Sequence, residues 1–461
     1  MINNPVWAQV VYLVAAIAFI LSLKGLSGPK TARMGSRVGA LGAFIAIVTL
    51  FAANIHLKHL WLIVIALAIG TIGGYFAAVR VKMTQMPQLV ALFNGAGGGT
   101  AMLVASIEFL QNGQHETKFA LAATVFTVLI GSVSFTGSIV TFLKLQELMT
   151  TKPIVYPGGK YTLVVIAAAA LAAAAWVFAS PSNTGLIVTV ALSLILGVMV
   201  VLPVGGADVP IVISLLNAFT GLSVAASGYV IGNVLLLVAG TLVGASGTIL
   251  TMDMAKAMGR SVLNTMFGAF NRTAAASGGA AAEDRPVRSA GPADIGVMLA
   301  YAQKVIFVPG YGLAVAQAQN TLRELADQLT SRGIEVAYAI HPVAGRMPGH
   351  MNVLLAEADV PYDQLLEMDE INPQFRDADV AVIVGANDVV NPAARTDTSS
   401  PIYGMPILNA DESQQIVFLK RSMRPGFAGV DNELMFSEKT TMLFGDAKDT
   451  LTKVVASVKA M

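Results

Sequence analysis

Val308-Pro-Gly-Tyr-Gly-Leu-Ala-Val315 is the stretch that decides the fold of the C-terminal third of this 461-residue chain. It has the pattern of a β-strand that runs into a glycine turn and then into a helix. Backbone N–H groups in such a turn can hold a pyrophosphate. The motif Gly310-x-Gly312-x-x-Val315 is weak by itself. Its context, with a strand before it, a helix after it and another strand about 20 residues later, favours a dinucleotide-binding unit.

A Lys-Arg pair ends another apolar segment, Ile416-Val-Phe-Leu-Lys-Arg-Ser422. Paired cations at the end of a strand suit an additional phosphate, such as the 2′-phosphate of NADP(H). The same pair is also compatible with a solvated surface, because Lys and Arg are common at strand ends. Gly426 and Gly429 flank Phe427, and they indicate a loop that moves or approaches another group closely.

Strands and helices alternate from residue 293 to the end of the chain. We expect strands at 304–308, 335–340, 378–384, 405–408, 415–419 and 441–444, and helices at 314–332, 351–358 and 447–459. Such alternation predicts a soluble α/β domain with a doubly wound, Rossmann-like parallel sheet.

The end of the strand at 335–340 differs from an ordinary NAD site, which has Asp or Glu there for the ribose hydroxyls. His341 and Pro342 stand at this place. Arg346 follows in a glycine-containing loop that can hold a phosphate. Asp388 follows the strand at 378–384, and it is either a turn former or a carboxylate of the site.

The first 260 residues are almost entirely apolar. The whole chain is 55% apolar and 12% charged, whereas soluble domains average roughly 25% charged residues. A helix needs about 20 apolar residues to cross a bilayer. We therefore expect nine spans, at 6–23, 38–54, 60–79, 87–108, 119–143, 161–179, 184–203, 209–230 and 233–255, of which the fourth is rich in glycine. Glycine pairs at close-packing spacing are Gly35/Gly39, Gly70/Gly74 and Gly240/Gly244.

This pattern predicts three parts: a transmembrane domain over residues 1–262, a flexible linker over 263–292 and a nucleotide-binding domain over 293–461. The linker sequence is small, polar and punctuated by Pro and Gly, so it cannot bury a core. The first span lacks a preceding cation and a following cleavage site, so we interpret it as a membrane helix and not as a signal peptide.

Loop charge predicts the orientation of the membrane domain. Cations follow the first, third, fifth and ninth spans, namely Lys24, Lys30, Arg33, Arg37, Arg80, Lys82, Lys144, Lys152, Lys160, Lys256 and Arg260. The loops on the other side hold only Lys58 and Lys118. The positive-inside rule then places the N-terminus outside and the C-terminal domain in the cytoplasm.

Composition also excludes several kinds of chemistry. The chain has no Cys, which excludes disulfides, Cys-ligated iron–sulfur clusters and catalytic thiols. Its five His residues lack metal-ligand spacing, so we expect no metal site. The net charge of +1 indicates no nucleic-acid surface.

Neutral polar side chains lie inside the expected spans, whereas Asp208 lies near a span end. Neutral polar residues that could line a narrow water path are Asn94, Ser132, Ser134, Thr136, Ser138, Ser214, Asn217, Ser246 and Thr248. We assign the proton path to Asn94, Ser132, Asn217 and Ser246 together with Asp208. A polar group in hydrocarbon is costly unless it is paired or hydrated. Hydrogen bonding between helices is the alternative interpretation, and it is stronger for Ser and Thr than for the two amides, which have more groups to satisfy.

Several segments closely resemble the β subunit of proton-translocating NAD(P)+ transhydrogenase. They are Gly310–Gln319, the long motif His341–Ala358, Glu367–Asn372, Gly385–Asp388, Lys420–Met423 and, in the membrane part, Val204–Asn217. The resemblance covers essentially the whole chain. It implies hydride transfer between NADH and NADP+ coupled to proton translocation across a bacterial inner membrane. It also implies NADP(H) on this chain, NAD(H) on a partner α subunit with further membrane helices, and an α2β2 assembly in lipid.

The resemblance also implies roles for single residues. Asp388, in coupling, and Tyr311 would be the catalytic positions. The cofactor-binding positions would be Gly310, Tyr311, Gly312, Ala314, Val315, Val343, Ala344, Gly345, Arg346, Met347, Pro348, Gly385, Ala386, Asn387, Asp388, Lys420, Arg421, Ser422, Gly426, Phe427, Ala428 and Gly429. Among them, Lys420, Arg421 and Ser422 would hold the 2′-phosphate, and Gly426–Gly429 would form part of a lid.

Two positions depart from the family pattern. Asn94 stands where members often have a His, so no histidine inside these spans can carry the proton. The carrier would then lie on the α subunit, or water would conduct past Asn94 and Asn217. Phe427 stands where a Tyr is frequent, which removes a hydroxyl contact.

The competing class is a channel or transporter gated by a nucleotide, but the sequence shows neither a filter nor a midplane ion site.

Overall fold

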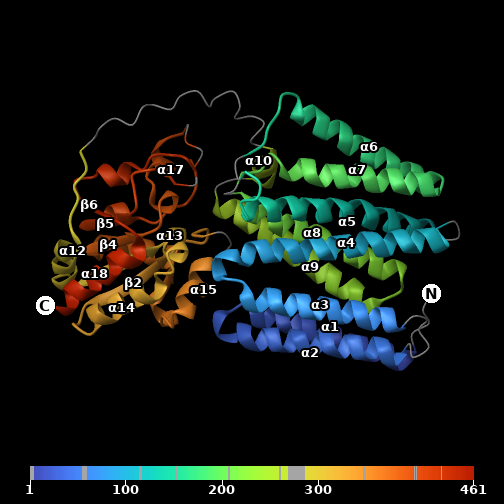
Figure 1. Ribbon diagram of the computed structural model, residues 1–461, viewed down its shortest axis with the longest axis horizontal. Helices are drawn as coiled ribbons and strands as arrows, with labels where there is room; N and C mark the ends of the chain where they lie inside the picture. The colour runs from blue at the N-terminus through green and yellow to red at the C-terminus, as the bar shows by residue number, and fades with distance from the viewer. Residues whose placement is uncertain are drawn as a thin grey trace. The chain divides into compact units, whose positions relative to one another are not determined.

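The computed structural model describes residues 5–53, 60–113, 117–150, 153–205, 208–258, 261–267, 286–345, 349–398, 400, 402–426 and 428–461. The chain forms two compact units, one made of long helices and one built around a parallel sheet (Figure 1).

In the described part of the chain, nine helices are long and apolar enough to cross a membrane. They are α1 (Val6–Leu26), α2 (Pro29–Ala53), α3 (Leu60–Arg80), α4 (Met86–Asn112), α5 (Lys118–Leu145), α6 (Gly159–Ala179), α7 (Asn183–Val201), α8 (Val209–Val230) and α9 (Val234–Ala257), followed by the short α10 (Val262–Phe267). The nine predicted spans are confirmed. Helix α2 begins at Pro29 and not at residue 38, because a polar, cationic turn precedes its apolar span.

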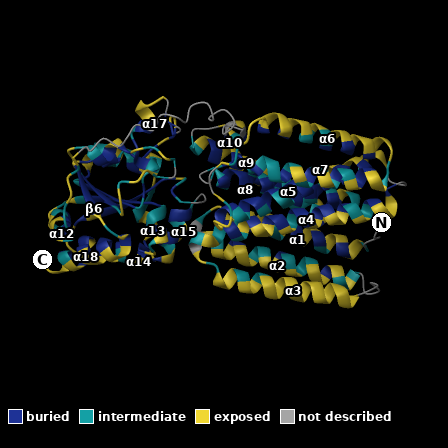
Figure 2. Cartoon of the chain, turned by 45° about the horizontal axis from the view of Figure 1, so that its top comes forward, coloured by how far each residue is buried: buried dark blue, intermediate teal, exposed yellow. Residues whose placement is uncertain are grey.

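Glycines let neighbouring helices approach closely in the helical unit. A Cβ atom added at Gly98 of α4 would lie 3.1 Å from the carbonyl oxygen of Gly131 on α5, and the glycine-rich fourth span is a regular helix. The pairs Gly35/Gly39 and Gly240/Gly244 also face close neighbours. Gly70 and Gly74 show no such packing, because no described residue lies within 4 Å of a Cβ atom at either glycine and no residue of α3 is buried (Figure 2).

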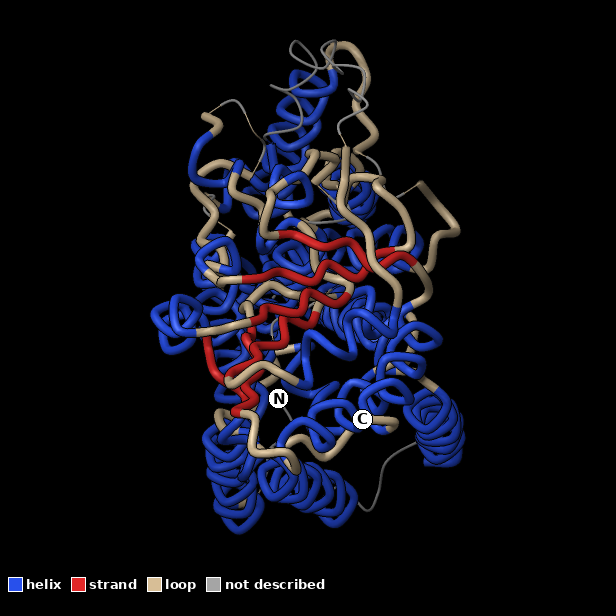
Figure 3. The backbone as a smooth tube through the Cα atoms, turned by 90° about the vertical axis from the view of Figure 1, so that its left-hand side faces the viewer, coloured by secondary structure: helices blue, strands red, loops and turns tan. Residues whose placement is uncertain are grey.

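The second unit contains a six-stranded parallel sheet in the order β3-β2-β1-β4-β5-β6 (Figure 3). Its strands are β1 (Lys304–Pro309), β2 (Glu335–Ile340), β3 (Leu365–Glu367), β4 (Val380–Val384), β5 (Gln415–Lys420) and β6 (Thr440–Phe444). This is the doubly wound order, with a topological switch point between β1 and β4 where such folds bind ligands. The predicted Rossmann-like architecture is confirmed.

Helices of this unit are α12 (Pro292–Ala300), α13 (Tyr311–Val315), α14 (Gln319–Thr330), α15 (His350–Glu357), α16 (Met368–Ile371), α17 (Ala393–Thr396) and α18 (Ala447–Lys459). Short 3-10 helices lie at η2 (Tyr362–Gln364), η3 (Asn372–Asp377), η4 (Asp388–Val390), η5 (Ala410–Glu412) and η6 (Glu433–Phe436), and η1 (Met83–Gln85) precedes α4.

Two strand predictions differ from the structure. The segment at 405–408 is a loop, because Pro406 has no N–H to donate and the N–H of Leu408 donates to the carbonyl oxygen of Val389. The short edge strand β3 was not predicted, since three residues carry too little alternation to identify.

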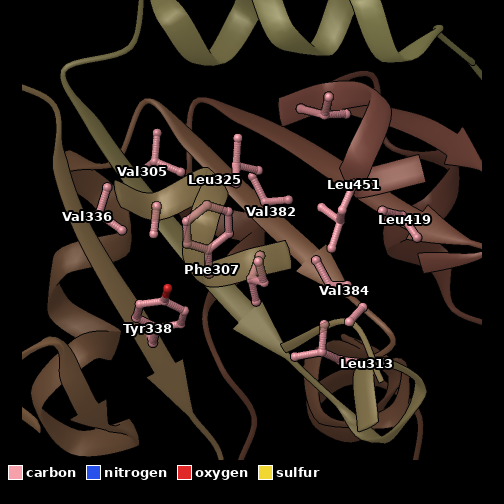
Figure 4. Close-up of a cluster of buried hydrophobic side chains, with 14 of the residues drawn as sticks. Val305, Phe307, Leu313, Leu325, Val336, Tyr338, Val382, Val384, Leu419 and Leu451 are labelled. Carbon is pink, nitrogen blue, oxygen red and sulfur yellow. The ribbon is translucent and has the colours of Figure 1, made fainter. Parts of the chain in front are cut away.

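Alternating residues of each strand point to opposite faces of the sheet, and a hydrophobic core lies on each face. One face packs Phe307 and Tyr338 against α14 and α18, through residues such as Leu325 and Leu451 (Figure 4). The other face packs Phe418 and its neighbours against short segments that include Phe375. Both faces are therefore covered, as parallel sheets require, and the carboxyl ends of β1, β4 and β5 meet at one edge.

Candidate functional site

The turns after β1 and β4 are joined by backbone hydrogen bonds at the switch point. The N–H of Gly310 donates to the carbonyl oxygen of Val384 (2.9 Å), and the N–H of Gly312 donates to that of Gly385 (2.9 Å). The N–H of Leu313 donates to the carbonyl oxygen of Gly310. A pyrophosphate at this turn would therefore depend on N–H groups other than these three.

Glycine at these positions permits direct backbone contact between the two turns. A Cβ atom at Gly310 would lie 2.4 Å from Cα of Ala386, and one at Gly385 would lie 2.3 Å from the nitrogen of Leu313. Gly385 also has a φ of 69°, which L side chains rarely adopt. The glycine motif thus fixes the distance between the ends of β1 and β4.

Gly385→Ala is expected to destabilise the α/β unit by about 2 kcal/mol more than Gly333→Ala does. Both positions have positive φ, but nothing lies within 4 Å of a Cβ atom at Gly333. The control variant therefore carries the backbone strain without the clash. Urea unfolding of residues 286–461 measures both changes, and equal losses would contradict the packing role of Gly385.

Asn387 and Asp388 connect the end of β4 to the segment that follows β5. The side-chain amide of Asn387 donates to Oδ1 of Asp388 (2.9 Å), and Nζ of Lys420 donates to Oδ1 of Asn387 (3.0 Å). Oδ2 of Asp388 accepts the backbone N–H of Ala428 (3.0 Å). Glycine is needed at Gly426, since a Cβ atom there would lie 2.5 Å from Oδ1 of Asp388. One carboxylate thus holds the expected lid segment by its backbone.

The predicted cation pair is divided between two environments. The ammonium of Lys420 is half-buried and also donates to the carbonyl oxygen of Arg424 (2.7 Å). Burial lowers the pKa of Lys420, and the negative charges of Asp388 and Asp431 partly oppose this. Arg421 and Ser422 are exposed. Lys420 therefore already has hydrogen-bond partners in the protein, and Arg421 is the exposed member of the pair.

His341 ends β2 as a buried neutral side chain. Its Nδ1 accepts the N–H of Val343 (3.2 Å), and its Nε2 then donates to the carbonyl oxygen of Pro406 (2.8 Å). Burial lowers its pKa to about 4, against the opposing effect of the bond to Pro406. His341 therefore orients the loop after β2 and does not replace the acidic residue of an NAD site.

The α/β unit is expected to lose about 2 kcal/mol of stability between pH 6.5 and pH 5 through His341 alone. The unfolded chain binds a proton below its ordinary pKa of about 6.5, whereas the folded state resists protonation down to a pKa of about 4. The contribution is thus complete above pH 6.5 and is lost as the pH falls toward 4. Urea unfolding of residues 286–461 at both pH values tests this, and His341→Gln should flatten the dependence. An unchanged dependence in that variant would contradict the assignment.

Two buried amides that sequence reasoning missed support the same segment. Asn432 donates to the carbonyl oxygen of Asn387 (3.0 Å), and Asn391 donates to that of Asp431 (3.0 Å). Both are fully buried, but an isolated Asn in a loop gives no signal of this role in a sequence.

The other predicted site residues lie around the same edge of the sheet. Tyr311, Ala314 and Val315 belong to α13, directly after the glycine turn, while Val343, Ala344 and Gly345 follow β2. Gly429 follows Ala428 in the lid segment, and its N–H donates to the carbonyl oxygen of Gly426. Arg346, Met347, Pro348 and Phe427 lie outside the described residues. No three His, Asp or Glu side chains converge as a metal site would need within the part of the chain that the structure describes.

The helical unit contains a buried polar cluster that joins α4, α5 and α8. Nδ2 of Asn94 donates to the hydroxyls of Ser138 (2.9 Å) and Ser134 (3.3 Å). Ser134 lies 2.5 Å from the hydroxyl of Thr220 and donates to the carbonyl oxygen of Leu216 (2.9 Å). Oδ1 of Asn94 is buried and accepts no hydrogen bond from the described residues. Asn94 therefore lies at the centre of an interhelical network.

The other predicted proton-path residues are not part of this cluster. Ser132 bonds to its own helix at the carbonyl oxygen of Val128 (2.6 Å), and the exposed Ser246 bonds to that of Val243. Asn217 is half-buried on α8, and Asp208 directly precedes that helix.

Within the described ranges, nine membrane-capable helices precede a doubly wound parallel sheet, which is the architecture of a multi-pass membrane protein with a Rossmann-like domain. The family model described as "NAD(P) transhydrogenase beta subunit" matches residues 8–457. Two relatives from Rhodospirillum rubrum named "NAD(P) transhydrogenase subunit beta" are each 47% identical over 455 residues, which cover 97% of this chain and 98% of the relative. The chain belongs to the NAD(P) transhydrogenase beta subunit family.

Proposed function

We propose that this chain is the NADP(H)-binding, proton-conducting subunit of a complex that transfers hydride between NADH and NADP+ and couples this to proton translocation. The observation that carries the proposal is the meeting of three features at one sheet edge: the glycine contact of β1 with β4, the Asn387–Asp388 cluster, and the cations that end β5. A gated channel would need neither the cation pair nor the carboxylate that holds the lid segment.

The donor set of this edge fits a dinucleotide with an extra phosphate. The exposed guanidinium of Arg421 and the hydroxyl of Ser422 supply hydrogen-bond donors. The glycines at the ends of β1 and β4 bring the two turns into backbone contact at the switch point, where doubly wound folds bind their ligands. His341 supplies no carboxylate for the ribose hydroxyls of NAD(H). We therefore assign NADP(H) to this chain and NAD(H) to a partner α subunit.

NADP(H), when bound, supplies the nicotinamide carbon that gives or receives the hydride. This chain then contributes position and orientation, since direct hydride transfer needs no acid or base. Tyr311 and the α13 turn would border the nicotinamide side, while Arg421 and Ser422 fix the opposite end. The lid segment, held through Asp388 and Ala428, would exclude water from the site and would control the time at which the nucleotide exchanges.

The membrane cluster offers a route for the proton. A buried amide oxygen such as Oδ1 of Asn94 ordinarily finds a partner, and a water molecule would provide one. A hydrated path past Asn94 would use the hydroxyls of Ser134 and Ser138 as donors and acceptors. Coupling then requires two conformations of the nucleotide site that differ in proton affinity.

Cellular location follows from the same proposal. The chain would lie in a bacterial inner membrane with its N-terminus outside and its α/β unit in the cytoplasm, in an α2β2 complex surrounded by lipid. The buried Lys144 no longer counts as a loop cation, because its ammonium lies inside the helical unit. The remaining charge asymmetry after the first, third and ninth helices supports the same orientation.

Purified chain, assayed with and without the α partner for NADH-driven reduction of an NADP+ analogue, tests this function. Reduction is expected only when both subunits are present, because the NAD(H) domain lies outside this chain. Reduction at the full rate by this chain alone, or none with the partner, would overturn the proposal.

Asp388→Asn is expected to lower the ratio of protons moved to hydride transferred by about tenfold while the fold is kept. The substitution removes the charge and disturbs the acceptor that holds the N–H of Ala428. The matched control is Asp363→Asn, an exposed carboxylate beside the edge strand β3. The test is to measure proton uptake and hydride transfer across pH 6–8. A ratio in Asp388→Asn equal to that of the parent would contradict a coupling role for Asp388.

A further inference from the structure

Lys144, in the last turn of α5, is a charged side chain buried completely inside the helical unit. Its Nζ donates to three carbonyl oxygens, those of Val201 (3.2 Å), Leu202 (2.6 Å) and Val204 (2.8 Å). An ammonium has three N–H donors, so all of them are used. No carboxylate of the described residues forms an ion pair with it at 4.0 Å or less.

The three acceptors belong to the end of α7 and to the turn that follows it. The last carbonyls of a helix lack partners within the helix and carry its negative dipole end. Lys144 therefore caps α7 from a neighbouring helix. Val204 is close in the sequence to Asp208, which directly precedes α8, so the side chain holds the chain shortly before α8 begins.

Two of the helices tied together here, α4 and α5, also belong to the polar cluster. Gln88, in the first turn of α4, donates to the carbonyl oxygen of Leu145 (3.1 Å), the residue next to Lys144. The N–H of Ile154 adds a second hydrogen bond to the carbonyl oxygen of Leu202 (3.0 Å). These contacts link α4, α5 and the residues at the end of α7, while the Asn94 cluster links α4, α5 and α8 further along.

We propose that Lys144 is a positioning residue for proton coupling: it holds the end of α7 and Val204 against α5, and this restrains α8 so that Thr220 and the carbonyl oxygen of Leu216 meet Ser134. A buried ammonium is a costly way to cap a helix, since desolvation opposes it. The three hydrogen bonds from this one nitrogen atom hold the end of α7 and Val204 rigidly against α5. The inference rests on the proposed proton-coupled function and adds a residue that this function alone does not assign.

The test compares three variants of the full chain with the α partner in sealed proteoliposomes. Lys144→Met keeps the length and the apolar stem but removes the charge and the three donors. Lys144→Arg keeps the charge and donors. Lys118→Met is the matched control, because Lys118 is exposed at the opposite end of the same helix.

Lys144→Met is expected to lower proton-coupled turnover about tenfold, with the affinity for NADP(H) within twofold of the parent. Lys144→Arg should recover part of the loss, and Lys118→Met should match the parent. A turnover of Lys144→Met equal to that of Lys118→Met, or a parallel loss of NADP(H) affinity, overturns the positioning role. If the parent and Lys118→Met also fail to couple, it is the proposed function that fails.

A double-mutant cycle with Ser134→Ala separates positioning from general stability. If Lys144 acts through the contact of Ser134 with α8, Lys144→Met adds less than about twofold in the Ser134→Ala background. If the double variant loses turnover by the full product of the two single losses, the proposal is overturned. If Lys144→Met does not accumulate in the membrane, Lys144→Gln takes its place in the same assays. If neither variant folds, Lys144 is needed for folding alone, and the positioning proposal is overturned.

Discussion

Replacing Lys420 and Arg421 together with Ala is expected to remove most of a preference for NADP(H) over NAD(H) that is at least about a hundredfold in the parent. Two charge-assisted hydrogen bonds to a 2′-phosphate contribute roughly 1.5–3 kcal/mol each, and NAD(H) offers no such group. Titration calorimetry on residues 286–461 with each nucleotide measures the preference directly.

The two cations are not expected to contribute equally. Lys420 already donates to Asn387 and to the carbonyl oxygen of Arg424, whereas Arg421 is exposed. Arg421→Ala alone should therefore lose at least as much of the preference as Lys420→Ala. Lys453→Ala, an exposed cation on α18, is the control and should leave the preference unchanged. Equal affinity of the parent for both nucleotides would overturn the assignment of the phosphate site.

Asn94→Leu is expected to lower proton uptake and coupled hydride transfer together, by about thirtyfold or more. The substitution removes the donor that Ser134 and Ser138 share, and each buried group left without a partner costs about 1–3 kcal/mol. Leucine would also exclude water from the path. The measurement is proton uptake in proteoliposomes with the α partner, beside hydride transfer in the same vesicles.

Asn94→His serves as the contrasting variant at the same position. Its ring keeps hydrogen-bond capacity and titrates near neutral pH, so it should retain transfer and add a pH dependence. Leu103→Ala, on the exposed face of α4, controls for general damage to this helix. Parent-like pumping by Asn94→Leu would show that the proton travels elsewhere and that Asn94 only packs.

The fold could be predicted from local sequence patterns because its elements are locally determined. The nine helices follow from apolar length, and the doubly wound sheet follows from strands such as Ile306–Val308 and Ala381–Val384, which are apolar on both faces. The strand predicted at 405–408 is wrong, because Pro406 opposes strand pairing in a segment that is otherwise apolar. Its conformation depends on partners at His341 and Val389, which lie far away in the sequence.

The sequence predicts which residues lie at the candidate site, but it does not predict which of them bind one another. Motifs located the ends of β1, β4 and β5, yet no motif revealed that Asp388 binds the backbone of Ala428 or that Lys420 is already partnered. Lys144 shows the same limit more plainly. Its position at the end of an apolar span indicates a loop cation, whereas tertiary packing buries it against three carbonyls at the end of α7 and just after it.

Proton movement by the reconstituted complex tests the central claim most directly. The parent chain and the α partner are sealed in proteoliposomes with a pH-sensitive dye, and NADH and an NADP+ analogue are added in turn. The account predicts a pH change that begins only when both nucleotides and both subunits are present, in step with hydride transfer, and that a protonophore abolishes. Hydride transfer at the full rate in sealed vesicles with no pH change would contradict it.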